Sequence, residues 1–401
     1  MSDTIQARLA AAPSLAFPVL LAASVCHFLN DLMQSLFTAT YPIFKTNYDL
    51  SFSQIGLLTL TYQLSASILQ PLIGLYTDSR PQPYSLPFGM GFSMAGLLTL
   101  AYAPSYPILL LGGVLLGIGS SIFHPETSRL ARIASGGSHG LGQSIFQVGG
   151  NLGSALGPLF VAFVVLPGGQ SRLSWFAVVA LTGIVILTGL SRWYVNNGHS
   201  KPRSPRARND ESHLSSRQVG GALGILTALM LSKYFYTASI STFYIFYLVQ
   251  KFGASEKLGQ ICLFVFFGAL AVGTLIGGPI GDRIGRKKVI WGSILGVLPF
   301  TLALPYASLP VTIALSAVIG LIIASAFSAI VVYAQELMPD RIGMISGLIF
   351  GLSFGMGGLG AAVLGVVADW TSVIFVYKIC AFLPALGVLA AFLPDTEPRE
   401  R

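Results

Sequence analysis

The stretch GPIGDRIGRKK, residues 278–288, ends one long apolar run and begins another. It could be mistaken for a phosphate-binding loop, but the Walker spacing and its terminal Lys-Ser or Lys-Thr pair are absent. A short turn between two membrane helices fits better, with Asp282 as a hydrogen-bond acceptor and basic residues at an anionic lipid surface. In the stretch GLYTDSR, residues 74–80, three residues separate Gly74 from Asp78, and the same spacing separates Gly278 from Asp282. Asp78 and Asp282 lie about half of the chain apart, which predicts a duplicated fold.

The composition indicates a chain that resides in a lipid bilayer. Hydrophobic residues make up 53% of the chain and charged residues 9%, with a mean hydropathy of +0.73, whereas a soluble domain carries roughly 25% charged residues. A membrane helix needs about 20 apolar residues to cross about 30 Å of hydrocarbon. We predict twelve such helices, at residues 17–44, 52–76, 84–103, 107–131, 140–166, 173–195, 219–250, 257–281, 287–306, 309–334, 342–367 and 373–394.

The predicted fold is an all-α membrane protein with twelve transmembrane helices in two six-helix, pseudo-symmetric bundles. We expect the first bundle at residues 1–195, a linker at 196–217 and the second bundle at 218–401. The linker is hydrophilic, and its Pro, Ser and Arg content argues against stable structure. The N-terminus resembles a secretory signal, but the apolar run continues to Phe44, so we expect an uncleaved first helix.

The basic residues predict the orientation of the chain in the membrane. With both termini in the cytoplasm, 17 of the 23 Lys and Arg residues fall in cytoplasmic segments and four in outer loops. Basic residues are enriched on the cytoplasmic side of membrane proteins, so we expect both termini there. This topology explains the net charge of +8, and no nucleic-acid-binding motif accompanies that charge.

The loop at residues 278–288 resembles the signature loop of the major facilitator superfamily, a family of secondary transporters. In the second half the residues that match that signature position for position are Gly278, Asp282, Arg283, Gly285, Arg286 and Lys287. In the first half Ser79, Pro81 and Pro83 depart from it, so the charge contacts there are expected to be weaker or differently built. The resemblance implies a gating role for these loop residues: Gly74, Asp78, Arg80, Gly278, Asp282, Arg283, Gly285 and Arg286.

The fifth predicted helix contains GGNLGSALGP, residues 149–158, with Gly149, Gly153 and Gly157 four residues apart. One interpretation is close helix packing, because small residues at this spacing let backbones approach. The other is functional, since Gly153, Gly157 and Pro158 resemble the fifth-helix motif of drug and proton antiporters in the superfamily. The trailing glycine pair of that motif is missing here. The resemblance favours export.

The first predicted helix carries His27, Asn30 and Asp31, and His27 and Asp31 share one helix face. Asp31 falls near the middle of its span, where an ionised carboxylate must face a polar cavity, find a cation or hold a proton. One interpretation is that the Asp31 carboxylate is structural and accepts a hydrogen bond from Asn30 or from a neighbouring hydroxyl group. The other is that Asp31 exchanges a proton during transport, with His27 as its partner.

Lys233 lies near the middle of the seventh predicted helix, the counterpart of the first. Its distance from both ends makes it hard for the ammonium group to reach water along the helix. We expect a cation that attracts an anionic substrate or neutralises Asp31. Lys378 lies closer to the end of its helix, where we expect the ammonium group to reach the interface.

The stretch SSIFHPETSRLAR, residues 120–132, puts polar residues in the cytoplasmic half of the fourth predicted helix. Pro125 lacks an amide hydrogen, so we expect the helix to kink or to restart there. If the helix restarts, the exposed backbone amides of Glu126 and Thr127 would form a small anion site beside His124. Glu126 and Arg129 are three residues apart and can form an ion pair. Alternatively, the helix has reached water and its charges are solvated.

Several segments resemble more closely a bacterial branch of the superfamily that exports phosphonate antibiotics: HFLNDLMQSL, SSIFHPETSRLARIASGG, QSIFQVGGNLGS, SKYFYTASIS, IGDRIGRKKVIWGSILGVLPF and FGMGGLGAAVLG. The likeness runs through all twelve predicted helices and is weakest at the termini and linker. It implies a proton-coupled efflux pump of the bacterial inner (plasma) membrane that works by alternating access. The fourth helix lacks the buried arginine that the superfamily usually carries early in that span, so that arginine's role is not transferred to Arg129. The candidate substrate-binding residues are Lys233, His124, Glu126, Arg129, Gln147 and Asn151.

Other functions remain open alongside export. Uptake or exchange of a physiological organic anion, such as a sugar phosphate, would use the same fold. A membrane enzyme using His124 and Glu126 has no supporting nucleophile or cofactor motif, so we expect no enzymatic activity. Cys26, Cys262 and Cys380 lie in separate apolar runs, so no disulfide, metal site or cofactor is expected. The expected partners are a small anionic drug or metabolite, protons and the lipid bilayer, and we expect a monomer that does not bind nucleic acid.

Overall fold

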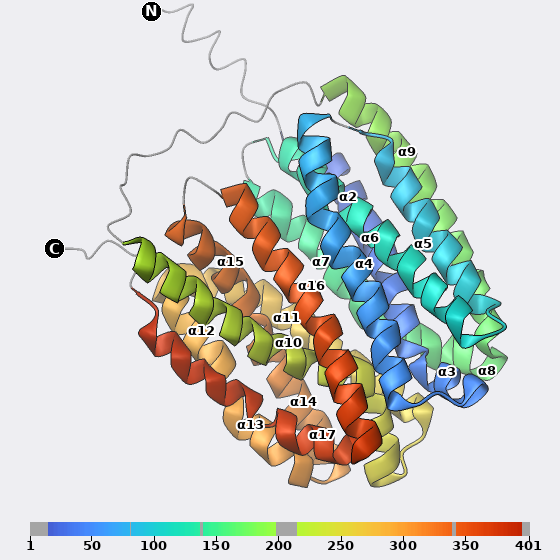
Figure 1. Cartoon of the computed structure of the whole chain (residues 1–401). Coiled ribbons are helices and arrows are strands. Elements are labelled where there is room, and N and C mark those ends of the chain that lie inside the picture. Colours follow the sequence, from blue (N-terminus) through green and yellow to red (C-terminus); the bar gives the residue numbers. More distant parts are fainter. Residues whose placement is uncertain (1–14, 81, 137–138, 198–214, 339–341, 395–401) are drawn as a thin grey trace, which may run out of the picture.

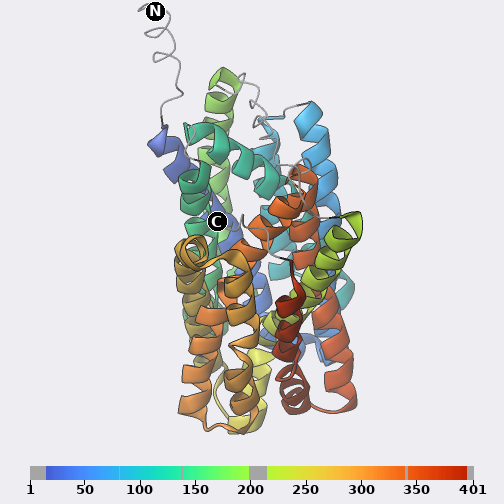
Figure 2. The ribbon, with the colours of Figure 1, turned by 90° about the vertical axis from the view of Figure 1, so that its left-hand side faces the viewer.

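The structure is a computed structural model that describes residues 15–80, 82–136, 139–197, 215–338 and 342–394. These residues form helices and the turns between them, and no strand occurs among them. The helices of both halves of the chain run along one common direction (Figures 1 and 2). The prediction of an all-α fold is confirmed. Most of the predicted linker at 196–217 lies outside the described residues.

The first half of the chain forms the helices from α2 to α9. Their bounds are α2 (Phe17–Ala39), α3 (Tyr41–Tyr48), α4 (Phe52–Ser79), α5 (Ser85–Ala101), α6 (Tyr106–Ala134), α7 (His139–Phe160), η1 (Val161–Val165), α8 (Leu166–Gly168), η2 (Gln170–Phe176) and α9 (Ala177–Asn197). Some predicted spans thus consist of consecutive helical segments, because Pro and Gly interrupt the regular hydrogen-bond pattern.

The second half forms the helices from α10 onward. Their bounds are α10 (Ser216–Phe252), α11 (Glu256–Ile284), α12 (Arg286–Leu295), α13 (Leu298–Ala303), η3 (Leu304–Tyr306), α14 (Leu309–Ala324), α15 (Ala326–Leu337), α16 (Ile342–Trp370), α17 (Val373–Cys380) and η5 (Leu383–Phe392). Each of the twelve predicted spans coincides with one or more of these helices.

Ten helical spans of the described chain are long and apolar enough to cross a membrane. A further apolar helix, α5, is shorter. Helix α4 has 28 residues, but it carries Gln54, Gln63 and Gln70 and is more polar. A helix of this length spans about 40 Å at 1.5 Å per residue, more than the thickness of the hydrocarbon core. The chain is therefore a multi-pass membrane protein.

Helix boundaries follow local sequence signals. At the start of α4 the Ser51 hydroxyl accepts from the Gln54 amide while the Gln54 side chain accepts from the Ser51 amide, which is a capping box. Ser215 and Gln218 form the same motif at the start of α10. Helix α10 ends at Gly253, whose φ of 63° lies in the left-handed region that glycine adopts without strain.

Pro125 lies inside α6, which continues without interruption from Tyr106 to Ala134. The expectation of a helix that restarts at Pro125 is therefore wrong, and so is the anion site at free amides beside His124. Membrane helices tolerate an internal proline because the surrounding helices hold the backbone in place. Here α6 packs against both α4 and α5.

The chain forms two halves that meet along a shared boundary. Within the first half α2 packs on α7 and α4 packs on α6, and within the second half α11 packs on α14 and α10 on α16. Between the halves α4 packs on α16 and α7 packs on α11. Figure 1 shows α4 and α16 side by side, although about 290 residues separate them in sequence.

The two ends of the bundle are named here from the course of the chain. Helix α9 ends at Asn197 and α10 begins at Ser216, at the end that we call the linker face, toward the top of Figure 1. Helix α4 begins at Phe52 and α16 ends at Trp370 at the opposite end, which we call the distal face. Both α2 and α6 cross from one face to the other.

The second loop motif joins two helices of its own half. Arg286 begins α12, and its Nη1 atom lies 2.7 Å from Oε1 of Glu336 in α15. Gly285 precedes it with a φ of 90°, a conformation that requires glycine. In the first motif, no heavy atom lies within 4 Å of the position that a Cβ of Gly74 would occupy.

The gating role of the loop residues stays a prediction. The side chains of Asp78 and Asp282, and the surroundings of Gly278, lie outside the described part of the structure. Arg80 and Arg283 are exposed at the ends of α4 and α11. Solvent-exposed basic groups at these positions fit a membrane surface.

The glycines of α7 let this helix contact the backbone of α2. A Cβ at Gly149 would lie 1.9 Å from the Ser24 carbonyl oxygen, and a Cβ at Gly153 would lie 2.2 Å from the Phe28 carbonyl oxygen. At Gly157 it would lie 2.3 Å from the Ser35 hydroxyl. The packing interpretation is confirmed. Pro158 follows inside α7, one turn before the π-helical segment η1, and the link of this motif to export stays a prediction.

Replacing Gly153 with valine should lower the thermal stability of the protein. The new side chain would meet the α2 backbone, so the helices must separate, at a cost on the order of 1–3 kcal/mol. Gly189→Val is the matched control, because Gly189 is exposed on α9 and no heavy atom lies within 4 Å of its Cβ position. Thermal unfolding of detergent-solubilised protein should give a lower Tm for Gly153→Val alone, and equal Tm values for the two variants would contradict this packing.

Candidate functional site

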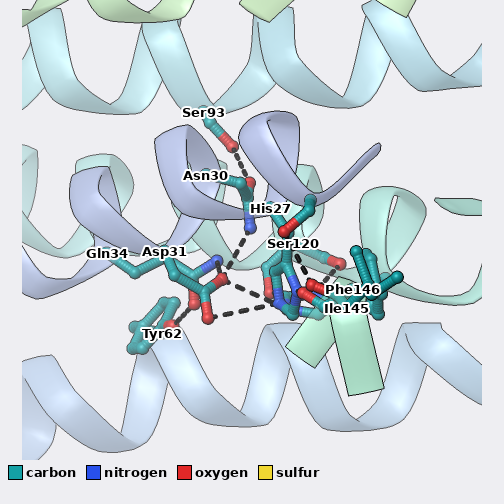
Figure 3. A network of polar contacts seen from close by, with 11 residues as sticks. His27, Asn30, Asp31, Gln34, Tyr62, Ser93, Ser120, Ile145 and Phe146 are labelled. Atoms are coloured by element: carbon teal, nitrogen blue, oxygen red, sulfur yellow. Dashed lines mark hydrogen bonds and ion pairs between the residues drawn. The ribbon is translucent and has the colours of Figure 1, made fainter. Parts of the chain in front are cut away.

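Asp31 of α2 lies between two histidines from different helices. The Nε2 atom of His27 is 3.3 Å from Oδ2 of Asp31, one helical turn away on α2. The Nε2 atom of His124, on α6, is 3.3 Å from Oδ1 of the same carboxyl group. Figure 3 shows Asp31 beside His27. We call His27, Asp31 and His124 the carboxylate–histidine cluster.

The other nitrogen of each imidazole faces a backbone carbonyl. His27 Nδ1 lies 2.8 Å from the Phe146 carbonyl oxygen on α7. His124 Nδ1 lies 2.9 Å from the Ser120 carbonyl oxygen, one turn earlier on α6. Because a carbonyl oxygen only accepts hydrogen bonds, each Nδ1 carries a hydrogen and donates it. Each Nε2 is therefore the atom at which a proton can bind or leave, directly opposite Asp31.

Two amides hold the carboxyl group in place from the other side. Asn30 Nδ2 donates to Asp31 Oδ1 at 3.2 Å, and Gln34 Nε2 donates to the same oxygen at 3.4 Å. The Tyr62 hydroxyl of α4 in turn donates to the Gln34 side-chain oxygen. Figure 3 shows this row of side chains from Tyr62 to Asp31. The hydrogen bond from Asn30 to Asp31 agrees with the structural interpretation, and the two histidines add contacts that this interpretation did not include.

Close packing fixes the position of His27. Its ring stacks on the Phe146 ring, with centroids 4.0 Å apart and planes at 16°. A Cβ at Gly150 would lie 2.4 Å from His27 Nε2 and 2.7 Å from Asp31 Oδ2. Glycine at position 150 therefore leaves the space in which these two groups meet. The ring is only 2% exposed, so its contacts are with protein atoms.

Three cation-binding atoms converge at the carboxylate–histidine cluster. They lie within 4.8 Å of one another, so their spacing alone would also suit a metal ion. The cluster offers three protein donors, whereas a closed structural zinc site usually has four. The amides of Asn30 and Gln34 already donate hydrogen bonds to the carboxyl group. We therefore interpret the cluster as a site that binds and releases protons.

Lys233 of α10 is a buried cation surrounded by aromatic rings. Its Nζ atom lies 5.3 Å from the centre of the Tyr234 ring and 5.4 Å from that of Phe327 on α15, and the residue is 5% exposed. Across the described residues, Nζ makes no hydrogen bond or ion pair. Ring faces attract a cation but do not neutralise it, so this site favours an anion from outside the described chain.

Helix α16 carries an aromatic ring near each of the two sites. Phe327 packs edge-on against Phe350 of α16, with centroids 5.2 Å apart. Phe354 lies one turn further along α16, and its ring centroid is 6.3 Å from that of His124. Because α16 belongs to the second half and α6 to the first, Phe354 and His124 meet at the boundary between the halves.

Glu126 and Arg129, both on α6, form an ion pair with each other. Arg129 Nη1 is 3.1 Å from Glu126 Oε1 and donates to the Thr77 carbonyl oxygen at 2.9 Å. Arg129 Nη2 donates to the Thr77 hydroxyl at 3.3 Å. These contacts tie α6 to the end of α4, beside the first loop motif. A role of Glu126 and Arg129 in substrate binding stays a prediction.

The remaining candidates lie on α7. Gln147 follows Phe146, whose carbonyl holds His27. Asn151 lies one turn later, and its buried Nδ2 has no hydrogen-bond partner among the described residues. A buried donor without a partner favours an acceptor from a ligand or water. Their role as substrate contacts also stays a prediction.

The sequence interpretation missed several residues of the site. Gln34 lies three residues after Asp31, so helical spacing could have indicated it. Tyr62 and Phe146 gave no such signal, because their roles depend on which helices pack together, whereas Ser120 lies one turn before His124 on the same helix. Gly150 was part of a recognised glycine run, but its contact with His27 required the structure.

Comparison with known proteins supports the assignment of the fold. The model of the Major Facilitator Superfamily matches residues 23–245 and 225–401. The bacterial homologue of the human lysosomal transporter Spinster has a TM-score of 0.73 at 16% identity, over 94% of each chain. The nucleoside transporter NupG has a TM-score of 0.73 at 15% identity, over 93% of this chain and 98% of its own. These two likenesses concern the fold alone.

Two relatives are similar in sequence over nearly the whole chain. The fosmidomycin resistance protein of Escherichia coli (strain K12) is 56% identical over 384 residues, or 96% of this chain and 94% of that protein. The uncharacterised MFS-type transporter YfnC of Bacillus subtilis (strain 168) is 41% identical over 383 residues, or 95% of this chain and 94% of that protein. With the family match and the two-halved helical fold, these identities establish that the chain belongs to the major facilitator superfamily of transporters.

Proposed function

We propose that this transporter exports fosmidomycin, or a related small anionic drug, in exchange for protons. The observation that carries the proposal is the pair of charged sites on opposite halves: the carboxylate–histidine cluster in the first half and buried Lys233 in the second. The relative at 56% identity is named for resistance to fosmidomycin, a phosphonate antibiotic. Resistance by a membrane transporter is most simply explained by export.

The carboxylate–histidine cluster is the proposed proton site. The Nε2 atoms of His27 and His124 each face one oxygen of Asp31. With both imidazoles neutral the cluster carries one negative charge, and with both protonated it carries one positive charge. Since the contacts at both Nδ1 atoms are occupied, protons load and leave at the Nε2 atoms or on Asp31 itself. We therefore propose that His124 belongs to the proton site together with Asp31 and His27.

Lys233 is the proposed anion site. A phosphonate can accept hydrogen bonds from its ammonium group, and the uncharged part of the drug can lie against Tyr234, Phe327 and Phe350. An anion there supplies the negative charge that the described surroundings of Lys233 lack. This assignment needs no contact between the drug and the carboxylate–histidine cluster.

The separation of the two sites decides the direction of coupling. If the anion touched the protonated cluster, charge attraction would make the two ligands bind together and cross in the same direction. Exchange instead requires that each ligand lower the affinity for the other. An anion held at Lys233 avoids the direct attraction, and the contact of His124 with Phe354 links the sites through the boundary between the halves. Alternating access then carries drug and protons in opposite directions.

The orientation follows from the basic residues. We propose that the linker face is cytoplasmic, because the sequence that joins α9 to α10 is rich in Lys and Arg, and the turn from α11 to α12 at that face carries Arg283, Arg286, Lys287 and Lys288. Both termini are then cytoplasmic, in the bacterial inner membrane. In this orientation the drug reaches Lys233 from the linker face and leaves at the distal face. We propose that one chain forms the complete transport unit, since both charged sites lie within it.

The second candidate function is uptake or exchange of a physiological organic anion, such as a sugar phosphate. The observation that favours it is the position of His124 at the boundary between the halves, where an anion could contact a protonated imidazole. Joint binding of proton and anion would then drive entry into the cell. The direction of net transport under an inward proton gradient distinguishes uptake from export.

Replacing Lys233 with methionine should abolish resistance to fosmidomycin. Loss of a charged hydrogen-bond partner costs about 1.5–3 kcal/mol, which corresponds to about tenfold or more in affinity. Lys378→Met is the matched control, because Lys378 is exposed near the end of its helix. The measurement is the inhibitory drug concentration for a sensitive bacterium expressing each variant at equal membrane levels. Full resistance with Lys233→Met would remove Lys233 from the anion site.

Asp31→Asn should abolish export driven by a pH gradient. The amide cannot exchange a proton at neutral pH and cannot stabilise a charged His27 or His124. Drug transport would be followed in inverted membrane vesicles, with the imposed pH gradient as the only driving force. Asn30→Ala serves as the comparison, because it removes a hydrogen bond to Asp31 but no proton-binding group. Unchanged pH-driven transport by Asp31→Asn would refute the proton site.

A further inference from the structure

The first turn of α4 is capped by a carboxylate from the other half of the protein. The Phe52 amide donates to Oδ1 of Asp369 at 2.7 Å, and the Ser53 amide donates to Oδ2 at 2.8 Å. The Ser53 hydroxyl also donates to Oδ2. Asp369 is the penultimate residue of α16, and all these contacts lie at the distal face.

The capping of α4 is thus shared between the two halves. The first amides of a helix lack partners within the helix, and its N-terminus attracts negative charge. Ser51, in the same half, accepts the hydrogen bond of the Gln54 amide. The two amides before it depend on Asp369. This division means that the amides of Phe52 and Ser53 lose their side-chain acceptor whenever the distal ends of the halves separate.

The backbones of α4 and α16 touch at the distal face and diverge toward the linker face. A Cβ at Gly365 would lie 2.4 Å from the Phe52 carbonyl oxygen, whereas at Gly358 the nearest atom would be 3.1 Å away. Further along α16, a Cβ at Gly355 would lie 3.4 Å from the Ser67 hydroxyl, and one at Gly351 would lie 3.9 Å from the Ser67 carbonyl oxygen. The nearest backbone atom of α4 is thus 2.4 Å from the Cβ position at Gly365 and 3.9 Å from that at Gly351.

Other contacts between the halves also lie in the distal part of the protein. The Phe52 ring packs against Phe246 of α10, with centroids 5.4 Å apart. Gln260 of α11 donates to the Ala39 carbonyl oxygen at the end of α2. The halves are therefore closed against each other at the distal face in this structure.

We propose that Asp369 is a state-determining residue of the transport reaction: a latch that holds the distal face closed and that must release α4 before this face can open. Alternating access requires the contacts at one face to break as those at the other form. The hydrogen bonds of Asp369 are of this kind, because donor and acceptor belong to different halves. The proposal depends on the family's mechanism and is independent of the identity of drug or proton site.

The test measures the opening of each face directly. Spin labels at Thr46 and Tyr306, exposed positions of the two halves, would report the distal face, and labels at Arg132 and Arg217 would report the linker face. The native cysteines, Cys26, Cys262 and Cys380, are buried and should not react. Distance distributions would be recorded by double electron–electron resonance on detergent-purified protein without drug.

Asp369→Ala should raise the ratio of distal-open to distal-closed protein about tenfold, as expected for loss of a charge-assisted cap. The distance between the distal labels should lengthen and that between the linker-face labels should shorten. Glu256→Ala is the matched control, because Glu256 is a carboxylate in the first turn of α11 in the same half. It should leave both distributions unchanged.

Asp369→Asn keeps one acceptor oxygen without the charge and should give a smaller shift in the same direction. If Asp369→Ala fails to fold, Asp369→Asn decides the outcome by itself. Distributions of both Asp369 variants that equal those of the wild type and Glu256→Ala would overturn the latch. The same shift in Glu256→Ala would also overturn it, because the effect would then follow from the loss of any distal carboxylate.

Discussion

The site depends on the contact between the glycine face of α7 and the backbone of α2. Gly149, Gly153 and Gly157 remove the side chains that would otherwise hold these helices apart. The hydroxyls of Ser24 and Ser35 then reach carbonyl oxygens on α7, at 2.7 Å and 2.6 Å. This close approach also brings the Phe146 carbonyl to His27, which turns the other ring nitrogen toward Asp31. Helix packing thereby determines which nitrogen of His27 faces Asp31.

The two halves have the same architecture but different charges at their centres. The first half contains a carboxyl group between two imidazoles, whose net charge changes with proton binding. The second half contains the buried Lys233 beside aromatic rings. Helix α16 places Phe350 against Phe327, near Lys233, and Phe354 beside His124 where the halves touch. A movement of α16 relative to α6 would therefore alter the surroundings of both sites, which is the physical requirement for coupling.

Features with a local sequence cause could be predicted, and features that depend on helix neighbours could not. The apolar runs give the helices, and the spacing of four residues places His27 beside Asp31. The contact of His124 with Asp31 could not be predicted, because it requires α6 to pack beside α2 at one particular rotation. For the same reason the hydrogen bond from Arg129 to Thr77 of α4 could not be predicted. The restart at Pro125 was wrong because neighbouring helices outweigh the local effect of proline.

The central claim is that drug and proton occupy separate sites and exclude each other through the conformation of the protein. Its most direct test is the affinity of detergent-purified protein for fosmidomycin, measured by isothermal titration calorimetry from about pH 8 to about pH 5.5, on either side of the usual histidine range near 6.5. The account predicts that the Kd rises as the pH falls, and that this dependence is lost in a variant with Asp31→Asn, His27→Asn and His124→Asn together. A Kd that falls at low pH would contradict it, because drug and protons would then bind together.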